Sequence, residues 1–398
     1  MGYVAVKGGT EAIEASLQRL RNQRIEDGVL LDIAAVRSGM KILIDQVMAE
    51  ASLYDETMAA LAIKQAEGSP EEAVFLLRAF RSTMPRLHYS RETATDGMWV
   101  ERRISSSFKD IPGGQILGTS PDYSHRLLDF SLMDENSEDI REMADRLAES
   151  ACSIPGVNTD LSTIPKVVDY LRREGLMSEP VASGIEPKDI TKEKLCFPTS
   201  RAERLQILAR GQTGAVTAFG YAAQRGYGAV LHPTVGELRV GRIPVTVLDP
   251  YTDSESGDPD DDYYLGEIRL TEVETLIPVP VKRAQGRTEI EFSLGYGVSF
   301  GRNETKVIAM SLIDYNLTDG DADAAVGDEE LILLHIDSVE ASGFTSHLKL
   351  PHYVTFQSKL DSVRKTRRGG TDDETVPAFA VPNVGGTRDS GFPEGGMV

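Results

Sequence analysis

The feature that most constrains the fold is a change in hydrophobic periodicity close to Gly228. Before this point, apolar side chains in residues 33–47 recur at spacings of three and four, which places them on one face of a helix. After it, apolar residues alternate with others in residues 243–247 and 290–294, as expected of half-buried antiparallel strands. The chain is therefore predicted to have an α+β fold, with a mainly helical N-terminal part and an antiparallel-sheet-plus-helix C-terminal part.

The length of 398 residues exceeds what one hydrophobic core normally accommodates, so we expect two domains. Residues 1–225 are predicted to form a mainly helical domain that contains a loop-rich segment at 88–126. Residues 226–366 are predicted to form the α+β domain. Residues 367–398 are rich in Gly, Pro, Thr and Asp and lack apolar periodicity, which indicates a disordered tail.

Local signals give bounds for several elements. Ser69 and Glu72, and likewise Ser200 and Glu203, have the spacing of a capping box, in which the two side chains satisfy free backbone N–H groups at a helix start. Gly68 and Gly343 are predicted to end helices. The other expected elements are a strand at 3–7 and helices at 11–23, 137–150, 164–174, 200–225, 303–317 and 328–341.

Composition excludes several classes of function. The net charge of −20 argues against broad contact with a nucleic-acid backbone, because such binding needs clustered Lys and Arg. Without a long apolar run or a signal-peptide pattern, we expect a cytoplasmic protein with no membrane partner. Cys152 and Cys196 cannot form a disulfide framework. The acidic stretches at 254–264 and 318–330 fit the calcium-loop pattern poorly and are interpreted as solvated loops.

Two of the six histidines lie in the stretch GFTSHLKLPHYV, at His347 and His352. A spacing of five turns side chains apart on a helix and puts them on opposite faces of a strand. Pro351 removes a backbone donor and keeps Leu350 out of helical conformation, so the segment is predicted to bend there. A bend allows both imidazoles to approach one metal ion.

A zinc site needs three or four ligands, so this pair is incomplete. The missing ligands can come from nearby side chains or from another chain. The alternative is that both histidines are polar residues on a loop that packs against a surface, and the spacing alone does not decide between these readings. The candidate ligands nearby in the sequence are His335, Asp337 and Glu340.

The same stretch resembles the signature near the C-terminal end of PhnI, the family of I subunits of the carbon-phosphorus lyase core complex. The resemblance covers roughly residues 1–362, whereas the acidic stretches and the tail from 367 look like additions. The other segments that resemble this family, in order and spacing, are MGYVAVKGG, WVERRISSSFKDIPGGQILGTSPDYSHRLLDFSL, SRAERLQILARGQTG, QRGYG and GYGVSFGRNETKVIAMSLID.

The resemblance implies a bacterial phosphonate-utilisation protein. In that family the subunit acts with G, H and L subunits to join a phosphonate to ribose C1′ of ATP, with Mg²⁺, expelling adenine. It implies a homodimer at the core of a complex that also includes the J and K subunits. The family's paired histidines hold zinc at the contact with the radical J subunit, and they correspond to His347 and His352.

This reaction needs an acid near the purine, a carboxylate near the sugar and cations around the triphosphate. The chain has no P-loop motif, and its best basic cluster lies in residues 101–115. Arginine offers paired donors to phosphate, and a glycine pair lets backbone amides approach it closely. The alternative is surface salt bridges around a simple turn. The candidate nucleotide ligands are Arg102, Arg103, Lys109, Gly113, Gly114 and Arg126, and the catalytic candidates are Asp110, Asp122 and His125.

Two classes of function remain open at this stage. The first is an enzyme subunit that displaces adenine from a nucleoside triphosphate, with purine nucleosidase activity of its own as a further expectation. The second is a non-catalytic scaffold that assembles the core complex and supplies zinc ligands to the J subunit. A free-standing purine nucleosidase fits the acidic, multi-segment chain less well.

Overall fold

The computed structural model describes residues 9–152, 164–179, 186–227, 233–248, 262–283, 286–320, 324, 326–350 and 352–368. The chain forms two compact units, a large one of residues 22–344 and a small one of residues 1–21 and 345–398. The predicted strand at 3–7 and the predicted tail beyond residue 368 lie outside the described residues. The predicted α+β class is confirmed, whereas the domain boundary at 225 and 226 stays a prediction.

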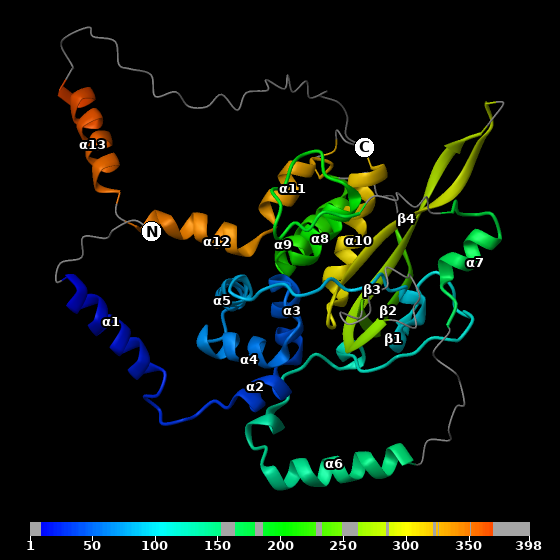
Figure 1. Cartoon of the computed structure of the whole chain (residues 1–398), viewed down its shortest axis with the longest axis horizontal. Helices are drawn as coiled ribbons and strands as arrows, with labels where there is room; N and C mark the ends of the chain where they lie inside the picture. Colours follow the sequence, from blue (N-terminus) through cyan, green and yellow to red (C-terminus); the bar gives the residue numbers. More distant parts are fainter. Residues whose placement is uncertain are drawn as a thin grey trace, which may run out of the picture. The chain divides into compact units, whose positions relative to one another are not determined.

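Four antiparallel strands form the sheet of the large unit, in the order β1-β2-β3-β4. They are β1 (Trp99–Ile104), β2 (Thr234–Leu248), β3 (Asp262–Lys282) and β4 (Thr288–Phe300). Strands β2 to β4 run side by side as the long ribbons of Figure 1. The antiparallel strands predicted after Gly228 are confirmed. The segment at 88–126 is mostly irregular, as predicted, but it also contains the short strand β1, which was not expected.

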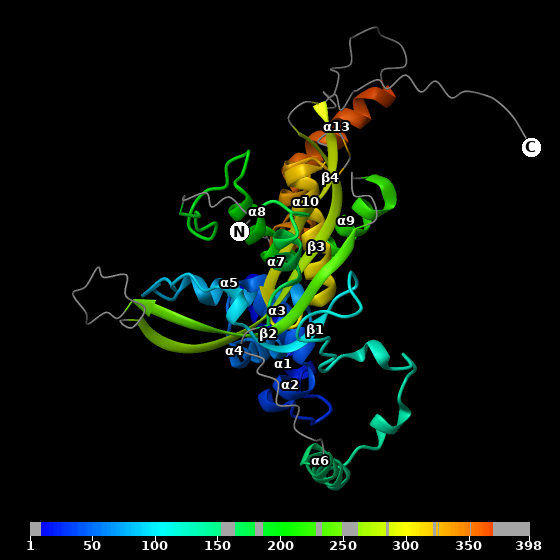
Figure 2. The same cartoon turned by 90° about the vertical axis from the view of Figure 1, so that its right-hand side faces the viewer.

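One face of the sheet is covered by helix α10 (Glu304–Asp319), which packs along β3 and β4 (Figure 2). Two glycines of β4 make this approach possible. A Cβ added at Gly295 would lie 2.2 Å from the backbone oxygen of Ser311, and one added at Gly297 would lie 2.4 Å from that of Val307. The sheet and helix therefore meet backbone to backbone, which any larger side chain at these positions would prevent.

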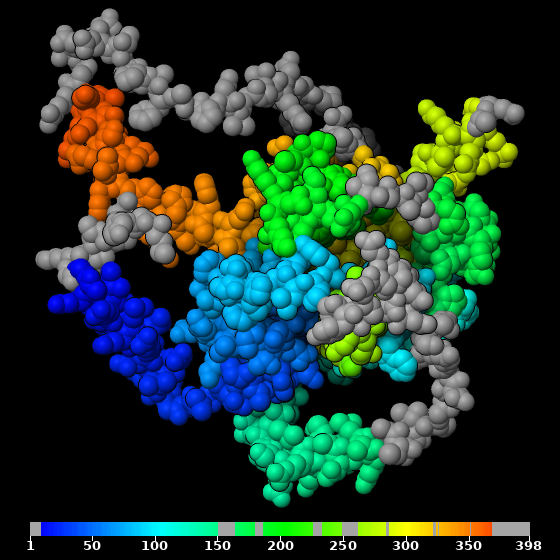
Figure 3. Space-filling view, viewed as in Figure 1, coloured from blue at the N-terminus to red at the C-terminus, as the bar shows by residue number. Residues whose placement is uncertain are grey.

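A helical body in the same unit consists of α2 (Ile33–Gly39), α3 (Lys41–Ala51), α4 (Glu56–Gln65) and α5 (Pro70–Ser82). It forms the continuous blue surface beside α8 in Figure 3. The single helix expected over residues 33–47 is broken, because Met40 leaves helical geometry at φ −116° and ψ 40°. The apolar face is still shared by both pieces, since their valines and methionine pack in one core: Val36, Val47 and Met48.

The capping box at Ser200 is confirmed, with both reciprocal hydrogen bonds to Glu203 present. At Ser69 one half is present, as its hydroxyl accepts from the backbone N–H of Glu72. The described part of the chain also contains α1 (Gly9–Gln23), α6 (Ser137–Cys152), α7 (Val167–Arg173), α8 (Arg201–Arg210), α9 (Thr213–Ala222), the π-helical turn η4 (Ala223–Tyr227), α11 (Glu329–His335), α12 (Ser338–Ser346) and α13 (Tyr353–Arg368).

Two predicted helices are each divided into two. The helix expected at 200–225 breaks at Gln212, whose backbone N–H donates to the oxygen of Ile336, 124 residues away and therefore invisible to local patterns. The helix expected at 328–341 breaks at Asp337, which accepts from the N–H groups of the next helix. Gly343 does not end that helix but lies within α12, so this prediction is wrong. None of the described helices has the length and apolar character needed to cross a membrane.

Candidate functional site

A cavity of about 280 Å³ lies at the N-terminus of α10 and brings together four segments that are far apart in the sequence, one of them in α3. Its walls include Asp122 and Arg126 from the predicted site, Thr213 at the start of α9, and residues 302–306. These residues belong to the segments SPDYSHR, ARGQTG and FGRNETK. The fold therefore gathers the motifs that carry the family resemblance around one hollow.

Positive groups surround this cavity. Arg126 adopts a left-handed backbone conformation, φ 58°, which is uncommon for a residue with a side chain and often marks a functional position. Arg302 is anchored by its own backbone N–H, which donates to Asp45 at 2.9 Å, and by its guanidinium, which donates to the oxygen of Thr119 at 2.7 Å. The N-cap residue Asn303 makes no side-chain capping bond. The positive end of a 16-residue helix is thus turned toward an arginine-rich wall, an arrangement that favours anions.

Two carboxylates, held by Arg102, balance these charges. Asp122 accepts from the guanidinium of Arg102 at 2.5 Å, and Glu304 lies 3.0 Å from its Nε. Arg102 itself is buried, whereas the side chain of Asp122 is 48% exposed. Arg102 is therefore placed behind the wall, where it orients two acids, and Asp122 is the group a ligand can reach.

Lys306 is a cavity residue that sequence reasoning missed. Its side chain is buried, and its ammonium group donates to the backbone oxygen of Ala209 at 2.7 Å. Burial lowers its pKa to about 8, an effect that the nearby carboxylate of Glu50 partly offsets. The only sequence signal was its place in GRNETK, since a lysine in the first turn of a helix is ordinarily read as a surface residue.

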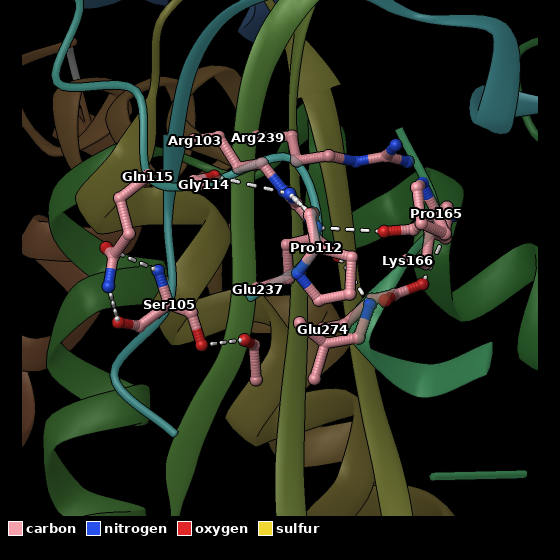
Figure 4. Close-up of polar contacts among 12 residues, drawn as sticks. Arg103, Ser105, Pro112, Gly114, Gln115, Pro165, Lys166, Glu237, Arg239 and Glu274 are labelled. Atoms are coloured by element: carbon pink, nitrogen blue, oxygen red, sulfur yellow. Dashed lines mark hydrogen bonds and ion pairs between the residues drawn. The ribbon is translucent and has the colours of Figure 1, made fainter. Parts of the chain in front are cut away.

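Arg103 is placed differently from the nucleotide ligand that the sequence predicted. Its guanidinium is fully buried, pairs with Glu237, and donates to the backbone oxygens of Pro112 and Gly114 (Figure 4). Gly113 has a φ of 82°, and the turn it makes wraps around this side chain. The carbonyl groups of the Pro-Gly-Gly turn, rather than its amides, thus face the arginine. A simple turn was the alternative that the sequence left open, but the salt bridge inside it is buried rather than at the surface.

The remaining predicted residues, Lys109, Asp110 and His125, are exposed, and none of them lines the cavity. Of the nine candidates, the structure brings only Asp122 and Arg126 to the cavity wall, with Arg102 directly behind. Gly113 and Gly114 lie at the turn around Arg103.

A second group of charges is buried on the sheet beside Arg103. Glu272 accepts from Arg239 and lies 3.0 Å from Lys166, and the two cations hold its pKa at about 2 against the opposing effect of burial. Glu274, 3.2 Å from Lys166, is buried beside other carboxylates. Its burial first, and then repulsion from Glu272 and Glu237, raise its pKa to about 7. This group ties strands together and has no opening to the cavity.

The two histidines are close in space despite their spacing of five. The ring centroids of His347 and His352 are 5.4 Å apart, with an angle of 61° between the ring planes. His347 begins a 3-10 turn that ends at Lys349, and Leu350 is extended at ψ 156°, as the following proline predicts. Nδ1 of His352 lies 2.6 Å from the backbone oxygen of Leu350. A backbone oxygen can only accept, so Nδ1 is assigned as the donor of this contact and Nε2 is the ring nitrogen that a metal ion can reach.

Comparison with known proteins identifies the relatives of this chain. A model of the bacterial phosphonate metabolism protein (PhnI) family matches residues 2–370. The chain belongs to the PhnI family. Similar members of known name include the putative C-P lyase subunit protein HtxH of Stutzerimonas stutzeri, which is 43% identical over 94% of this chain and 98% of its own length.

Two further relatives carry the name alpha-D-ribose 1-methylphosphonate 5-triphosphate synthase subunit PhnI. The protein of Rhizobium meliloti strain 1021 is 42% identical, covering 92% of this chain and 95% of the relative. The protein of Escherichia coli strain K12 is 40% identical, covering 92% and 98%. The similarity thus extends over nearly the whole of each chain, so the PhnI fold is shared throughout rather than through one module.

The zinc ion implied by membership in the PhnI family can be tested against the donor set. Two imidazoles bound to one tetrahedral zinc have ring centroids about 5 Å apart, given the usual metal–nitrogen distance of about 2 Å. The observed 5.4 Å agrees, and the Leu350 carbonyl supplies the outer hydrogen bond that metal-binding histidines usually make. Among the described residues, no group of three or more His, Cys, Asp and Glu side chains has a metal-binding arrangement. The pair therefore fits as half of a zinc site.

Proposed function

We propose that this PhnI-family chain is a subunit of a phosphonate-degrading carbon-phosphorus lyase system. Within that system it takes part in displacing adenine from ATP by a phosphonate. Support comes from two relatives named as subunits of a synthase whose product is a ribose with a methylphosphonate at C1 and a triphosphate at C5. A nucleoside triphosphate already holds the ribose 5-triphosphate part of this product, and only its base must be replaced.

The chemistry sets clear demands on the site. The bond between C1′ and N9 of adenine breaks while a phosphonate oxygen bonds to C1′. The electron pair of the broken bond goes to the purine, which takes up a proton. Positive charge develops on the sugar in the transition state, so a nearby carboxylate stabilises it, and an acid near the purine assists departure. The phosphonate is already an anion and needs only to be positioned.

The cavity at α10 meets the electrostatic part of these demands, and this is the observation that carries the proposal. Arg126, Arg302 and the N-terminus of α10 form a positive wall for the triphosphate with its Mg²⁺. Asp122 is the more exposed of the two carboxylates on the same wall. We assign it the place beside the sugar, with the guanidinium of Arg102 orienting it.

The small unit supports the existence of partners. Around the histidine pair, the apolar side chains of Leu348, Tyr353 and Val354 are 68%, 65% and 87% exposed. Such apolar surface is typical of a subunit interface. The expected partners are the G, H, J, K and L subunits and a second copy of this chain, with the J subunit completing the zinc site of His347 and His352. In that site the chain's own role is to hold the ion by two neutral nitrogens.

A scaffold without a catalytic role is the second candidate. The observation that favours it is the structural use of Arg103, which donates to backbone oxygens of the Pro-Gly-Gly turn. A scaffold would still supply His347 and His352 to a partner. It would leave the chemistry of adenine displacement entirely to other subunits.

Adenine release decides between the two. The assembled complex, given ATP, methylphosphonate and Mg²⁺, is compared with complexes that carry Arg126→Gln or Arg302→Gln. Loss of one charge-assisted phosphate contact is expected to lower adenine release about 10-fold or more. The control is Arg173→Gln, an exposed charge of α7 that lies outside the cavity. Unchanged release by both cavity variants in fully assembled complexes would leave only the scaffold.

A further inference from the structure

A second cavity of the large unit, of about 390 Å³, lies between α5, α8 and the sheet. None of the residues predicted from the sequence lines it, and it shares no lining residue with the cavity at α10. Three arginines reach it from different segments: Arg81 from α5, Arg86 from the loop after α5, and Arg210 from the last turn of α8. Three positive charges from separate elements converge here on one hollow.

Two of these guanidinium groups have few acceptors. Arg81 donates to the backbone oxygen of Ser52, and Arg210 donates to the hydroxyl of the same residue. Each guanidinium carries five N–H donors, so most of its capacity remains for a ligand or for water. Among the described residues, no carboxylate lies within ion-pair distance of either side chain. Arg86 does have such a partner, Asp189, at 3.2 Å.

The charge balance around the cavity is positive. Behind Arg210 lies Arg78, which donates to its backbone oxygen and pairs with Asp337 at 2.6 Å. Two carboxylates act on Arg210, Asp337 and Asp189, and each already pairs with another arginine. Burial first, and then Arg78 and Arg81, lower the pKa of Arg210 to about 10. Excess positive charge that is partly buried is costly, and a bound anion would offset that cost.

The rest of the lining describes the shape of the ligand. Leu205, Leu270, Val298 and Phe300 supply apolar walls, with Phe300 and Val298 from β4. The volume is within the range of small-molecule sites, which combine apolar walls with a few polar groups. A bare inorganic anion fills only the arginine end. A ligand that also carries a flat apolar part would use both.

We propose that this arginine-lined cavity is a binding site for a phosphate-bearing small molecule, held by Arg81, Arg86 and Arg210. Fixed paired donors from three arginines match the oxygens of phosphate or of a polyphosphate. Such groups can come from a nucleotide, whose base would lie against Leu205 and Phe300, or from a free phosphate or pyrophosphate. The site is separate from the cavity at α10, so this inference stands whether or not the proposed function holds.

Calorimetric titration of the full-length protein tests the inference, with pyrophosphate, inorganic phosphate and ATP as separate probes. Pyrophosphate is expected to bind, and Arg81→Gln and Arg210→Gln are each expected to weaken it about 10- to 100-fold, the loss from one charged hydrogen-bonding group. Arg86 lies at the exposed rim of the cavity, so Arg86→Gln tests the same site without disturbing buried packing. Arg37→Gln on α2 removes an exposed charge outside the cavity and is expected to bind as wild type does.

The probes also separate the sources of the ligand. Tighter binding of ATP than of pyrophosphate, lost in the same variants, indicates a nucleotide, whereas equal affinities indicate a free phosphate compound. Failure of all three probes to bind wild-type protein would overturn the inference, as would binding that every arginine variant keeps. Adenine release by complexes with Arg86→Gln is measured in parallel. If this variant still releases adenine but no longer binds pyrophosphate, the phosphate site and the proposed function are shown to be separate.

Discussion

Arg103 and Glu237 form an ion pair that is fully enclosed by protein, with the two side chains 0% and 1% exposed. Glu237 also accepts from the backbone N–H of Val167 at 2.9 Å. One carboxylate therefore joins β1, β2 and the start of α7. The guanidinium of Arg103 also donates to the backbone oxygen of Gly114, which fixes the Pro-Gly-Gly turn.

Removal of one partner of this pair is expected to be costly. Arg103→Met leaves the buried carboxyl group of Glu237 without its arginine, so we expect the free energy of unfolding to fall by about 3–5 kcal/mol. Urea denaturation measures this loss. Lys109→Met removes an exposed charge from the same segment and is expected to change stability by less than about 0.5 kcal/mol. Similar stability of the two variants would contradict the structural role of Arg103.

The same pair explains why β1 could not be predicted. The sequence WVERRI contains three charged residues in a row, which normally indicates a solvated loop. In the folded chain Arg102 and Arg103 are both buried, because Asp122 and Glu237 come from distant segments to pair with them. Hydrophobic periodicity carries no information about such long-range partners. A strand that is buried by ion pairs is therefore invisible to it.

Features set by neighbouring residues were predictable. The capping box of Ser200 and Glu203 needs only residues three apart, and it is present as expected. The extended Leu350 follows from the proline after it. The cavity at α10 was only half predictable, because the segment of Asp122 and Arg126 stood out as charged, whereas Lys306 owes its place to burial under α8.

The histidine pair gives a prediction for zinc content. We expect His347→Ala and His352→Ala each to lower the zinc bound per assembled complex, because each removes one of the two nitrogens this chain offers. Inductively coupled plasma mass spectrometry of purified complexes measures the ratio. His88→Ala removes an exposed histidine elsewhere and serves as control. Wild-type zinc content in both pair variants would exclude the pair as ligands.

Lys306 predicts a dependence of stability on alkaline pH. Its pKa is lowered by burial from the ordinary 10.5 to about 8, so between these values the unfolded chain binds a proton that the folded chain does not. Stability of the wild type should therefore rise as pH increases from 8 to 10.5, by about 3 kcal/mol for this group. Below pH 8 the burial cost is present in full.

Lys306→Met is expected to abolish this rise in stability with pH. Its gain in free energy of unfolding over wild type should be largest below pH 8. Urea denaturation at intervals from pH 7 to 10.5 provides the measurement. Lys41→Met, at an exposed position on α3, should keep the wild-type slope. A slope in Lys306→Met equal to that of wild type would mean that the buried amine does not titrate in this window.

Glu274 should produce the opposite slope at acidic pH. Burial and the neighbouring carboxylates raise its pKa from the ordinary 4.5 to about 7, so between these values the folded chain holds a proton that the unfolded chain releases. The stability this group contributes is fully present below pH 4.5 and is lost as pH rises to 7, again by about 3 kcal/mol. Glu272, whose pKa is about 2, stays ionised throughout because Arg239 and Lys166 both contact it.

Glu274→Gln keeps the shape of the side chain and stays neutral. Its free energy of unfolding relative to wild type should therefore increase from pH 4.5 to 7 and then level off. The measurement is the difference in free energy of unfolding between the two proteins across this range, which cancels groups that titrate equally in both. Glu92→Gln, an exposed carboxylate in the loop before β1, should track wild type. A constant difference between Glu274→Gln and wild type would show that Lys166, 3.2 Å away, already keeps Glu274 ionised.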